Sequence, residues 1–273
     1  METKKKILCV GLVCYDIVNV VENYPVEDTQ MRTVEQRRSR GGNASNMCTV
    51  LANLNAACEF MGSLPMGPAP DLNYVEEDFQ THQIEHGNCQ RHAGYLLPNS
   101  CIIVNRQSGS RTILHTNDGL PELTKRDFSH VNVEDYNWFH LEGRPNAIDI
   151  AEIAKDLKTK APNIPISLEM EKPTRAKKDE LFLVFPFIDL LFISKECAIS
   201  LGAMNMRDAV HLLQDLLPDN VSVVCPWGEK GAAAKDPNGH IYEISGYPPP
   251  SGKIFYLTKC QIQYKMDKLK YDR

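Results

Sequence analysis

Residues 40–54 read RGGNASNMCTVLANL, and this stretch joins a pair of glycines to a segment with helical spacing. We predict a helix over residues 44–54 that opens directly after Gly41 and Gly42. The apolar run at residues 7–10 lies upstream and predicts a buried strand, and residues 58–61 predict another strand downstream. A strand, a helix and a second strand in succession indicate an α/β fold.

The same alternation continues along the chain. Further apolar runs predict strands at residues 101–104, 138–141, 164–168, 189–194 and 221–225. Helical spacing recurs in Ile150, Ile153, Ala154 and Leu157, and again in Ala209, Leu212, Leu213 and Leu216. Nearly continuous apolar strands between amphipathic helices predict a mostly parallel central sheet with helices on both faces.

Two stretches have a different pattern. Residues 18–34 and 101–114 resemble antiparallel ribbons, and the second contains a Gln-Ser-Gly-Ser turn at residues 107–110. We expect a small accessory sheet from strands within about residues 12–39 and 98–117. A late hairpin is predicted around Pro237-Asn238-Gly239.

Composition restricts the class of protein. The 273 residues carry a net charge of -5, with 42% hydrophobic and 24% charged residues, which is typical of a globular protein. This balance predicts no nucleic-acid partner and no membrane partner. Asp16 interrupts the first apolar stretch too early for a signal peptide. Nine cysteines without a C-x-x-C pair favour reduced thiols, so we expect a cytoplasmic protein.

The end of the sequence differs from the rest. Residues 251–273 hold six Lys or Arg and two Asp, a net charge of +4, directly after three prolines at 248–250. We therefore expect a domain over residues 1–250 and an atypical basic tail over 251–273.

Polar residues gather around the glycine pair. Asn43 and Asn46 are three residues apart, so both project from one side of the first helical turn. Each amide donates and accepts hydrogen bonds, which suits the hydroxyl groups of a polyol. Asp16 follows the first strand, where α/β proteins place ligand-binding side chains. Neither feature requires a ligand. The glycine pair and the asparagines can be a turn followed by a helix cap, and Asp16 can be an ordinary turn residue.

Several short motifs together resemble the ribokinase/PfkB sugar-kinase family over about residues 6–250. The motifs are CVGLV at 9–13, Asp16, Tyr24-Pro25, Glu27-Asp28, RGGNASN at 40–46, SGSRTI at 108–113, LEGR at 141–144, EKP at 171–173, FISK at 192–195 and YPPP at 247–250. The resemblance implies a ribokinase-like sandwich with a β-sheet lid over the sugar. In one branch of the family this lid also builds a homodimer.

The resemblance also implies a reaction and a sugar site. The expected activity is phosphoryl transfer from ATP, with Mg²⁺, to the 1-hydroxyl of fructose. Asp16, Gly42, Asn43 and Asn46 would hold the sugar, and Asp28 would reach in from the lid. No residue of the chain is expected to be a direct metal ligand.

A second set of residues matches the family's ATP and phosphate positions: Arg111, Glu142, Lys172, Lys195, Trp227 and Gly228. The resemblance places Arg111 near the transferred phosphate, where a guanidinium neutralises charge. It places Glu142 beside Mg²⁺, which keeps most of its waters. Taken singly, each of these charges would more often be a solvated surface residue, and Trp227-Gly228 is as readily explained as part of a strand-connecting turn.

One family signature has no counterpart. After the prolines the family carries Asp-Thr-x-Gly-Ala-Gly-Asp, whereas this sequence reads Ser251-Gly252-Lys253-Ile254. The missing glycines would form an anion hole and the missing final Asp would be the general base. We therefore expect no catalytic base, and we expect the C-terminal part of the fold to be missing. Three hypotheses remain: an impaired sugar kinase, a non-catalytic isoform that binds sugar or dimerises, and a product without a stable fold.

Overall fold

The protein, described here from a computed structural model, contains a main sheet of eight strands. The structure describes residues 5–172 and 178–246, so the predicted tail at 251–273 and the YPPP motif lie outside the described residues. The strands are β1 (Lys6–Val10), β4 (Cys58–Met61), β9 (Tyr136–Glu142), β10 (Ile166–Met170), β11 (Leu190–Ile193), β12 (Ser222–Pro226), β13 (Ala232–Lys235) and β14 (Ile241–Ile244). Their order is β14-β13-β12-β11-β10-β9-β1-β4. The pairs from β12 to β4 are parallel and the last two pairs are antiparallel, which confirms a mostly parallel sheet.

Helices cover both faces of this sheet because side chains alternate along each strand. Leu8 belongs to a buried cluster with α3, whereas its neighbour Cys9 belongs to a second cluster with α1 and α2. The helices are α1 (Asn43–Asn53), α2 (Pro70–Thr81), α3 (Ala147–Lys160), α4 (Lys178–Leu181), α5 (Lys195–Ser200) and α6 (Met206–Leu212). Short 3-10 turns occupy Lys125–Phe128, Val133–Asp135, Phe182–Phe187, Leu213–Asp215 and Gly228–Lys230.

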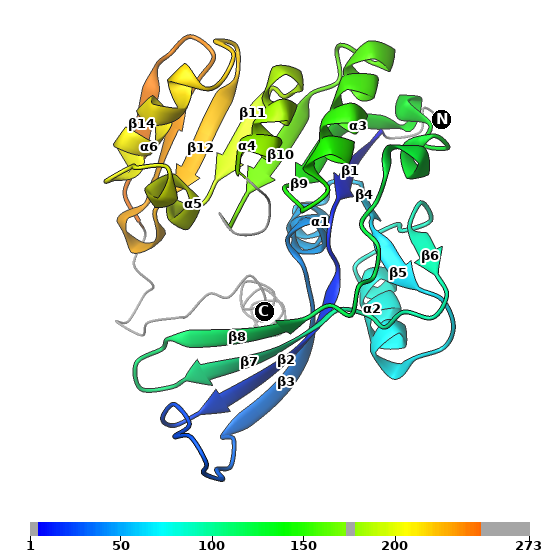
Figure 1. The fold of residues 1–273 in the computed structure, drawn as a ribbon, viewed down its shortest axis with the longest axis vertical. Helices are drawn as coiled ribbons and strands as arrows, with labels where there is room; N and C mark the ends of the chain where they lie inside the picture. Colours follow the sequence, from blue (N-terminus) through cyan, green and yellow to red (C-terminus); the bar gives the residue numbers. More distant parts are fainter. Residues whose placement is uncertain (1–4, 173–177, 247–273) are drawn as a thin grey trace.

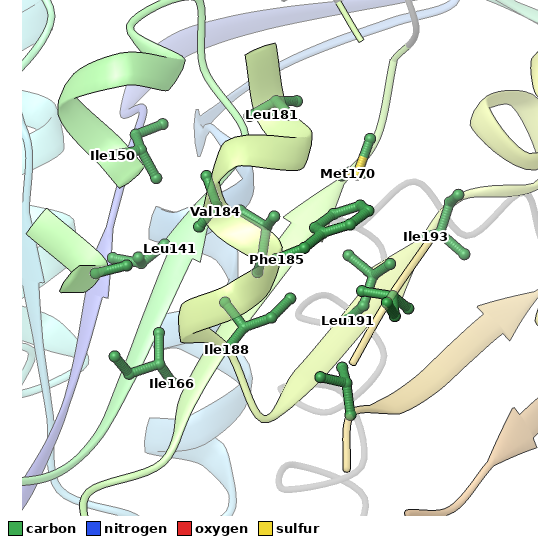
Figure 2. Close-up of a cluster of buried hydrophobic side chains, with 14 of the residues drawn as sticks. Leu141, Ile150, Ile166, Met170, Leu181, Val184, Phe185, Ile188, Leu191 and Ile193 are labelled. Atoms are coloured by element: carbon green, nitrogen blue, oxygen red, sulfur yellow. The ribbon is translucent and has the colours of Figure 1, made fainter. Parts of the chain in front are cut away.

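The larger cluster fills the space between α3 and the sheet. Figure 2 shows Val184 and Phe185 of the Phe182–Phe187 turn, and Ile188 directly after it, lying against strand residues that include Leu141 and Leu191. Val184 and Leu191 are fully buried, so this layer stabilises the sheet through the hydrophobic effect. No helix in the described ranges is both long and apolar enough to cross a bilayer.

Four further strands form the lid. They are β2 (Cys14–Val21), β3 (Glu35–Gly41), β7 (Asn99–Asn105) and β8 (Arg111–Thr116), in the order β3-β2-β7-β8. Both predicted ribbons are antiparallel pairs, and a parallel pair, β2 with β7, joins them. In Figure 1 the lid lies below the main sheet, with α1 between the two.

The sequence-based boundaries were wrong in three places. Residues 22–34 connect β2 to β3 instead of forming strands, and Asp28 there adopts a positive φ of 59°. The expected helix around Ala209–Leu216 ends as an α-helix at Leu212 and continues as a 3-10 turn. Neither α2 nor the small sheet of β5 (Ser63–Pro65) and β6 (Gln90–His92) was predicted.

Candidate functional site

The glycine pair determines where α1 begins. Gly42 has φ 97°, and a Cβ atom at this position would lie 2.1 Å from the carbonyl oxygen of Leu12. Only glycine fits such a close approach of two backbone segments. Asn46 N donates to Gly42 O across 2.9 Å, which starts the helix at the end of β3. The first turn of α1 therefore lies where the lid meets the main sheet.

A cavity of about 130 Å³ lies between the lid, the start of α1 and the segment after β10. The residues predicted for the site that line this cavity are Asp16, Gly42, Asn43, Asn46, Arg111 and Lys172. They come from β2, α1, β8 and the end of β10, so segments more than 150 residues apart in the sequence meet here. The cavity combines carboxylate, amide and basic side chains.

Asp16 is the buried carboxyl group of the cavity, with 7% of its surface exposed. The Sγ of Cys14 donates to its Oδ1 across 3.3 Å. Burial raises the pKa of Asp16, and hydrogen bonds from Ser100 and Cys14 oppose that rise. A Cβ atom on Gly41 would lie 2.2 Å from Oδ2 of Asp16, so the first glycine of the pair provides the space for this carboxylate.

Asn43 connects α1 to the end of β10. Its Nδ2 donates to Oε2 of Glu171 across 2.6 Å and lies 3.4 Å from Oε1 of Glu169. These contacts fix the plane of the Asn43 amide beside the cavity. Asn46, one helical turn later, lines the same wall.

Glu142 lies outside the cavity lining and is 2% exposed. Its Oε2 accepts hydrogen bonds from the backbone N–H groups of Leu12, at 2.9 Å, and Ala44, at 3.1 Å. Arg144 Nη1 lies 3.5 Å from its Oε1. The structure thus places Glu142 where it binds the start of α1 and the segment that leads into the lid.

The remaining predicted residues lie elsewhere. Asp28 is exposed in the connection between β2 and β3 and does not line the cavity. Lys195, Trp227 and Gly228 lie at the carboxyl ends of β11 and β12, with Lys195 Nζ 5.7 Å from the centre of the Trp227 ring. This is the edge of a parallel sheet at which α/β proteins bind ligands.

Four cavity residues whose side chains can hydrogen-bond were missing from the predicted site: Cys14, Ser100, His115 and Glu171. Glu171 belongs to the EKP motif, so the sequence contained a signal for it. Ser100 and His115 belong to none of the matched motifs, and only the pairing of lid strands brings them together.

The side chains of the cavity can be compared with the ligands that Mg²⁺ takes in phosphoryl-transfer sites. No cluster of three or more His, Cys, Asp or Glu side chains able to hold a metal exists within residues 5–172 and 178–246. Mg²⁺ in phosphoryl-transfer sites is held mainly by phosphates and water, with one or two carboxylates. Glu171 supplies one carboxylate beside the basic Lys172, so these residues fit such an ion.

Comparison with known proteins identifies the family and the fold. The sequence profile of the pfkB family carbohydrate kinases matches residues 4–250. Mouse ketohexokinase is 38% identical over 252 residues, covering 90% of this chain and 83% of the mouse protein. The ribokinase of Giardia lamblia superposes with a TM-score of 0.75 at 16% identity, covering 89% of this chain and 75% of the other. A ribokinase of Arabidopsis thaliana, solved with ribose and ATP, has a TM-score of 0.70 at 16% identity, with coverage of 90% and 80%. The fold, the motifs and these matches together show that the chain belongs to the pfkB family of carbohydrate kinases.

Proposed function

We propose that this sugar kinase binds fructose and ATP in the lid cavity and that its transfer of phosphate to the 1-hydroxyl is impaired. The observation that supports sugar binding is the convergence of Asp16, Asn43 and Asn46 on one cavity. The similarity to mouse ketohexokinase supports a ketohexose as the sugar. The ATP in the Arabidopsis ribokinase structure supports ATP as the donor.

In this proposal each side chain has a chemical task. The ionised Asp16 accepts hydrogen bonds from sugar hydroxyls, while the amides of Asn43 and Asn46 donate and accept. Arg111 and Lys172 neutralise the charge on the phosphoryl oxygens. Bound Mg²⁺, beside Glu171, would further neutralise the phosphates.

We propose impaired transfer because no side chain is assigned the role of accepting the proton from the attacking hydroxyl. Transfer needs a base within hydrogen-bond reach of that proton. The 273 residues contain no Asp-Thr-x-Gly-Ala-Gly-Asp sequence, which is where the resemblance places the base and the anion hole. The alternative, favoured by the same combination of an assembled cavity and a missing base, is a non-catalytic protein that binds sugar.

Two measurements on the purified chain test the proposal. We expect fructose to raise the melting temperature, because a ligand that binds only the folded state stabilises it. We expect Asp16→Ala to abolish that shift. We also expect ADP release with Mg-ATP to stay near background when fructose is added. Fructose-dependent ADP release that Asp16→Ala abolishes would show that transfer is intact and would contradict impairment.

We further propose a homodimer formed through the lid, in the cytosol. Exposed apolar side chains on the lid and its connections support the dimer, with Val34 51% and Leu114 58% exposed. The eight described cysteines are all thiols, which supports a reducing compartment. Sedimentation equilibrium tests the dimer by measuring the mass of each protein in solution. Wild type should have the mass of a dimer, and Leu114→Glu, which places a charge in the interface, should have the mass of a monomer.

The proposed division of the chain places the kinase domain at residues 1–250 and a separate tail at 251–273. The family match, which ends at residue 250, supports this boundary. A chain ending at Pro250 should then bind fructose with the affinity of the 273-residue chain. A weaker affinity of the shorter chain would contradict the boundary.

A further inference from the structure

A row of polar side chains crosses the lid beside the cavity. Asp16 on β2 is the register partner of Ser100 on β7, and Ser100 is the register partner of His115 on β8. Residues that are directly opposite one another on neighbouring strands point to the same side of a sheet. All three residues line the cavity, so the row lies on the lid face that covers the proposed sugar site.

Hydrogen bonds connect the members of the row. Ser100 Oγ and His115 Nδ1 are 3.1 Å apart. A hydrogen bond from Ser100 acts on Asp16 and lowers its pKa against the effect of burial. Ser100 is 4% and Asp16 7% exposed, so protein atoms rather than bulk water surround this part of the row. Low exposure makes the bond between Ser100 and Asp16 stronger than it would be in water, whereas His115 itself is exposed.

The chemistry of the groups gives the row a direction. An ionised carboxylate only accepts hydrogen bonds, and a serine hydroxyl has a single proton to donate. When Ser100 donates that proton to Asp16, its oxygen is available to accept a hydrogen bond from His115. The proton of the imidazole then lies on Nδ1, and this arrangement holds the Asp16 carboxylate in one orientation.

We propose that His115 is a positioning residue for sugar binding, acting through Ser100 to orient the Asp16 carboxylate. This inference rests on the proposed function, since it assigns a sugar-binding task to Asp16. The other titratable or charged groups that line the cavity are Cys14, Arg111, Glu171 and Lys172. None of the sequence motifs includes Ser100 or His115, so the lid adds a determinant of affinity outside the family pattern.

The first test measures fructose affinity by calorimetry for a double-mutant cycle. Ser100→Ala should weaken binding about tenfold, the value of one hydrogen bond to a charged group, and His115→Leu, which removes a hydrogen bond to a neutral hydroxyl, should weaken it about fivefold. The double variant should bind no more weakly than Ser100→Ala alone, because His115 acts through Ser100. His115→Asn keeps a side-chain amide near the position of Nδ1 and should restore affinity to within about twofold of wild type. The inference would be overturned if His115→Leu bound fructose with wild-type affinity. It would also be overturned if the loss of affinity in the double variant equalled the product of the two single losses.

The second test does not depend on the sugar. In protein labelled with ¹³C at aspartate carboxyl groups, the titration midpoint of Asp16 should rise in both His115→Leu and Ser100→Ala and return toward wild type in His115→Asn. An unchanged midpoint in His115→Leu would overturn the inference whether or not fructose binds. Failure of wild type to bind fructose would instead overturn the proposed function, while the titration would still decide whether His115 acts on Asp16.

Discussion

Asn43 donates a hydrogen bond from Nδ2 to Oε2 of Glu171 across 2.6 Å, which joins the first turn of α1 to the segment after β10. The two residues are 128 positions apart in the sequence. Their contact fixes the orientation of an amide that lines the proposed sugar cavity. Sugar affinity should therefore depend on a residue of the EKP motif as well as on the glycine-asparagine motif.

Replacing Glu171 tests this dependence. We expect Glu171→Ala to weaken fructose binding about fivefold, because Asn43 loses the acceptor that holds its amide. Glu171→Gln keeps an acceptor oxygen and should change affinity by less than about twofold. Calorimetric titration measures both variants. Equal affinities of Glu171→Ala and wild type would show that Asn43 is oriented without this contact.

Gly42→Ala should destabilise the fold by more than about 3 kcal/mol and abolish fructose binding. The added Cβ atom would overlap the backbone of Leu12, and the residue would also keep an unfavourable positive φ. Gly202→Ala is the matched control, since Gly202 has φ 109° but no atom within 4 Å of an added Cβ. It should lose only about 1–2 kcal/mol. Urea unfolding of both variants measures the difference, and equal losses would contradict an overlap at Gly42.

Arg40 is expected to stabilise the fold rather than bind ligand. Its Nε donates to Oδ1 of Asp78 across 2.6 Å, and its guanidinium lies 4.3 Å from the centre of the Phe79 ring. Because the Arg40 side chain is only 2% exposed, Arg40→Met should lower the free energy of unfolding by about 3 kcal/mol. The surface pair of Arg91 and Glu76 is the control, and Arg91→Met should cost less than about 1 kcal/mol. Urea unfolding that gives similar losses for the two variants would contradict this role.

The central parallel strands of the main sheet were predictable because most of their side chains, on both faces, are buried. Runs such as residues 7–10 and 138–141 are almost wholly apolar, and their positions in the sequence match β1 and β9. The RGGNASN motif was informative for a different reason. Gly42 has a backbone geometry that only glycine adopts easily. A glycine at this position of the sequence therefore indicates a tight junction before a helix.

Contacts between distant segments were not predictable from local patterns. The pairing of β2 with β7 is parallel and joins residues 84 positions apart, such as Asp16 and Ser100, and no short-range signal specifies it. The register of this pairing alone aligns Asp16 with Ser100 and, one strand further, with His115. Helix α2 was missed because Leu72, Val75 and Phe79 form a sparse apolar stripe among polar residues.

The pair of His82 and Asp78 at the end of α2 gives the last prediction, a stability that depends on pH. A hydrogen bond with Asp78 raises the pKa of His82 and outweighs its burial. Because the pKa of His82 is higher in the folded state, its protonation stabilises the fold. This contribution is complete at pH values below the ordinary histidine pKa of about 6.5, and it is lost as the pH rises through the folded-state pKa. The free energy of unfolding of wild type relative to His82→Gln should therefore fall as the pH rises from about 6 to 8. Urea unfolding across this range measures the difference, with the exposed His130→Gln as control. If the profiles of wild type and His82→Gln run parallel, the pair does not couple protonation to folding.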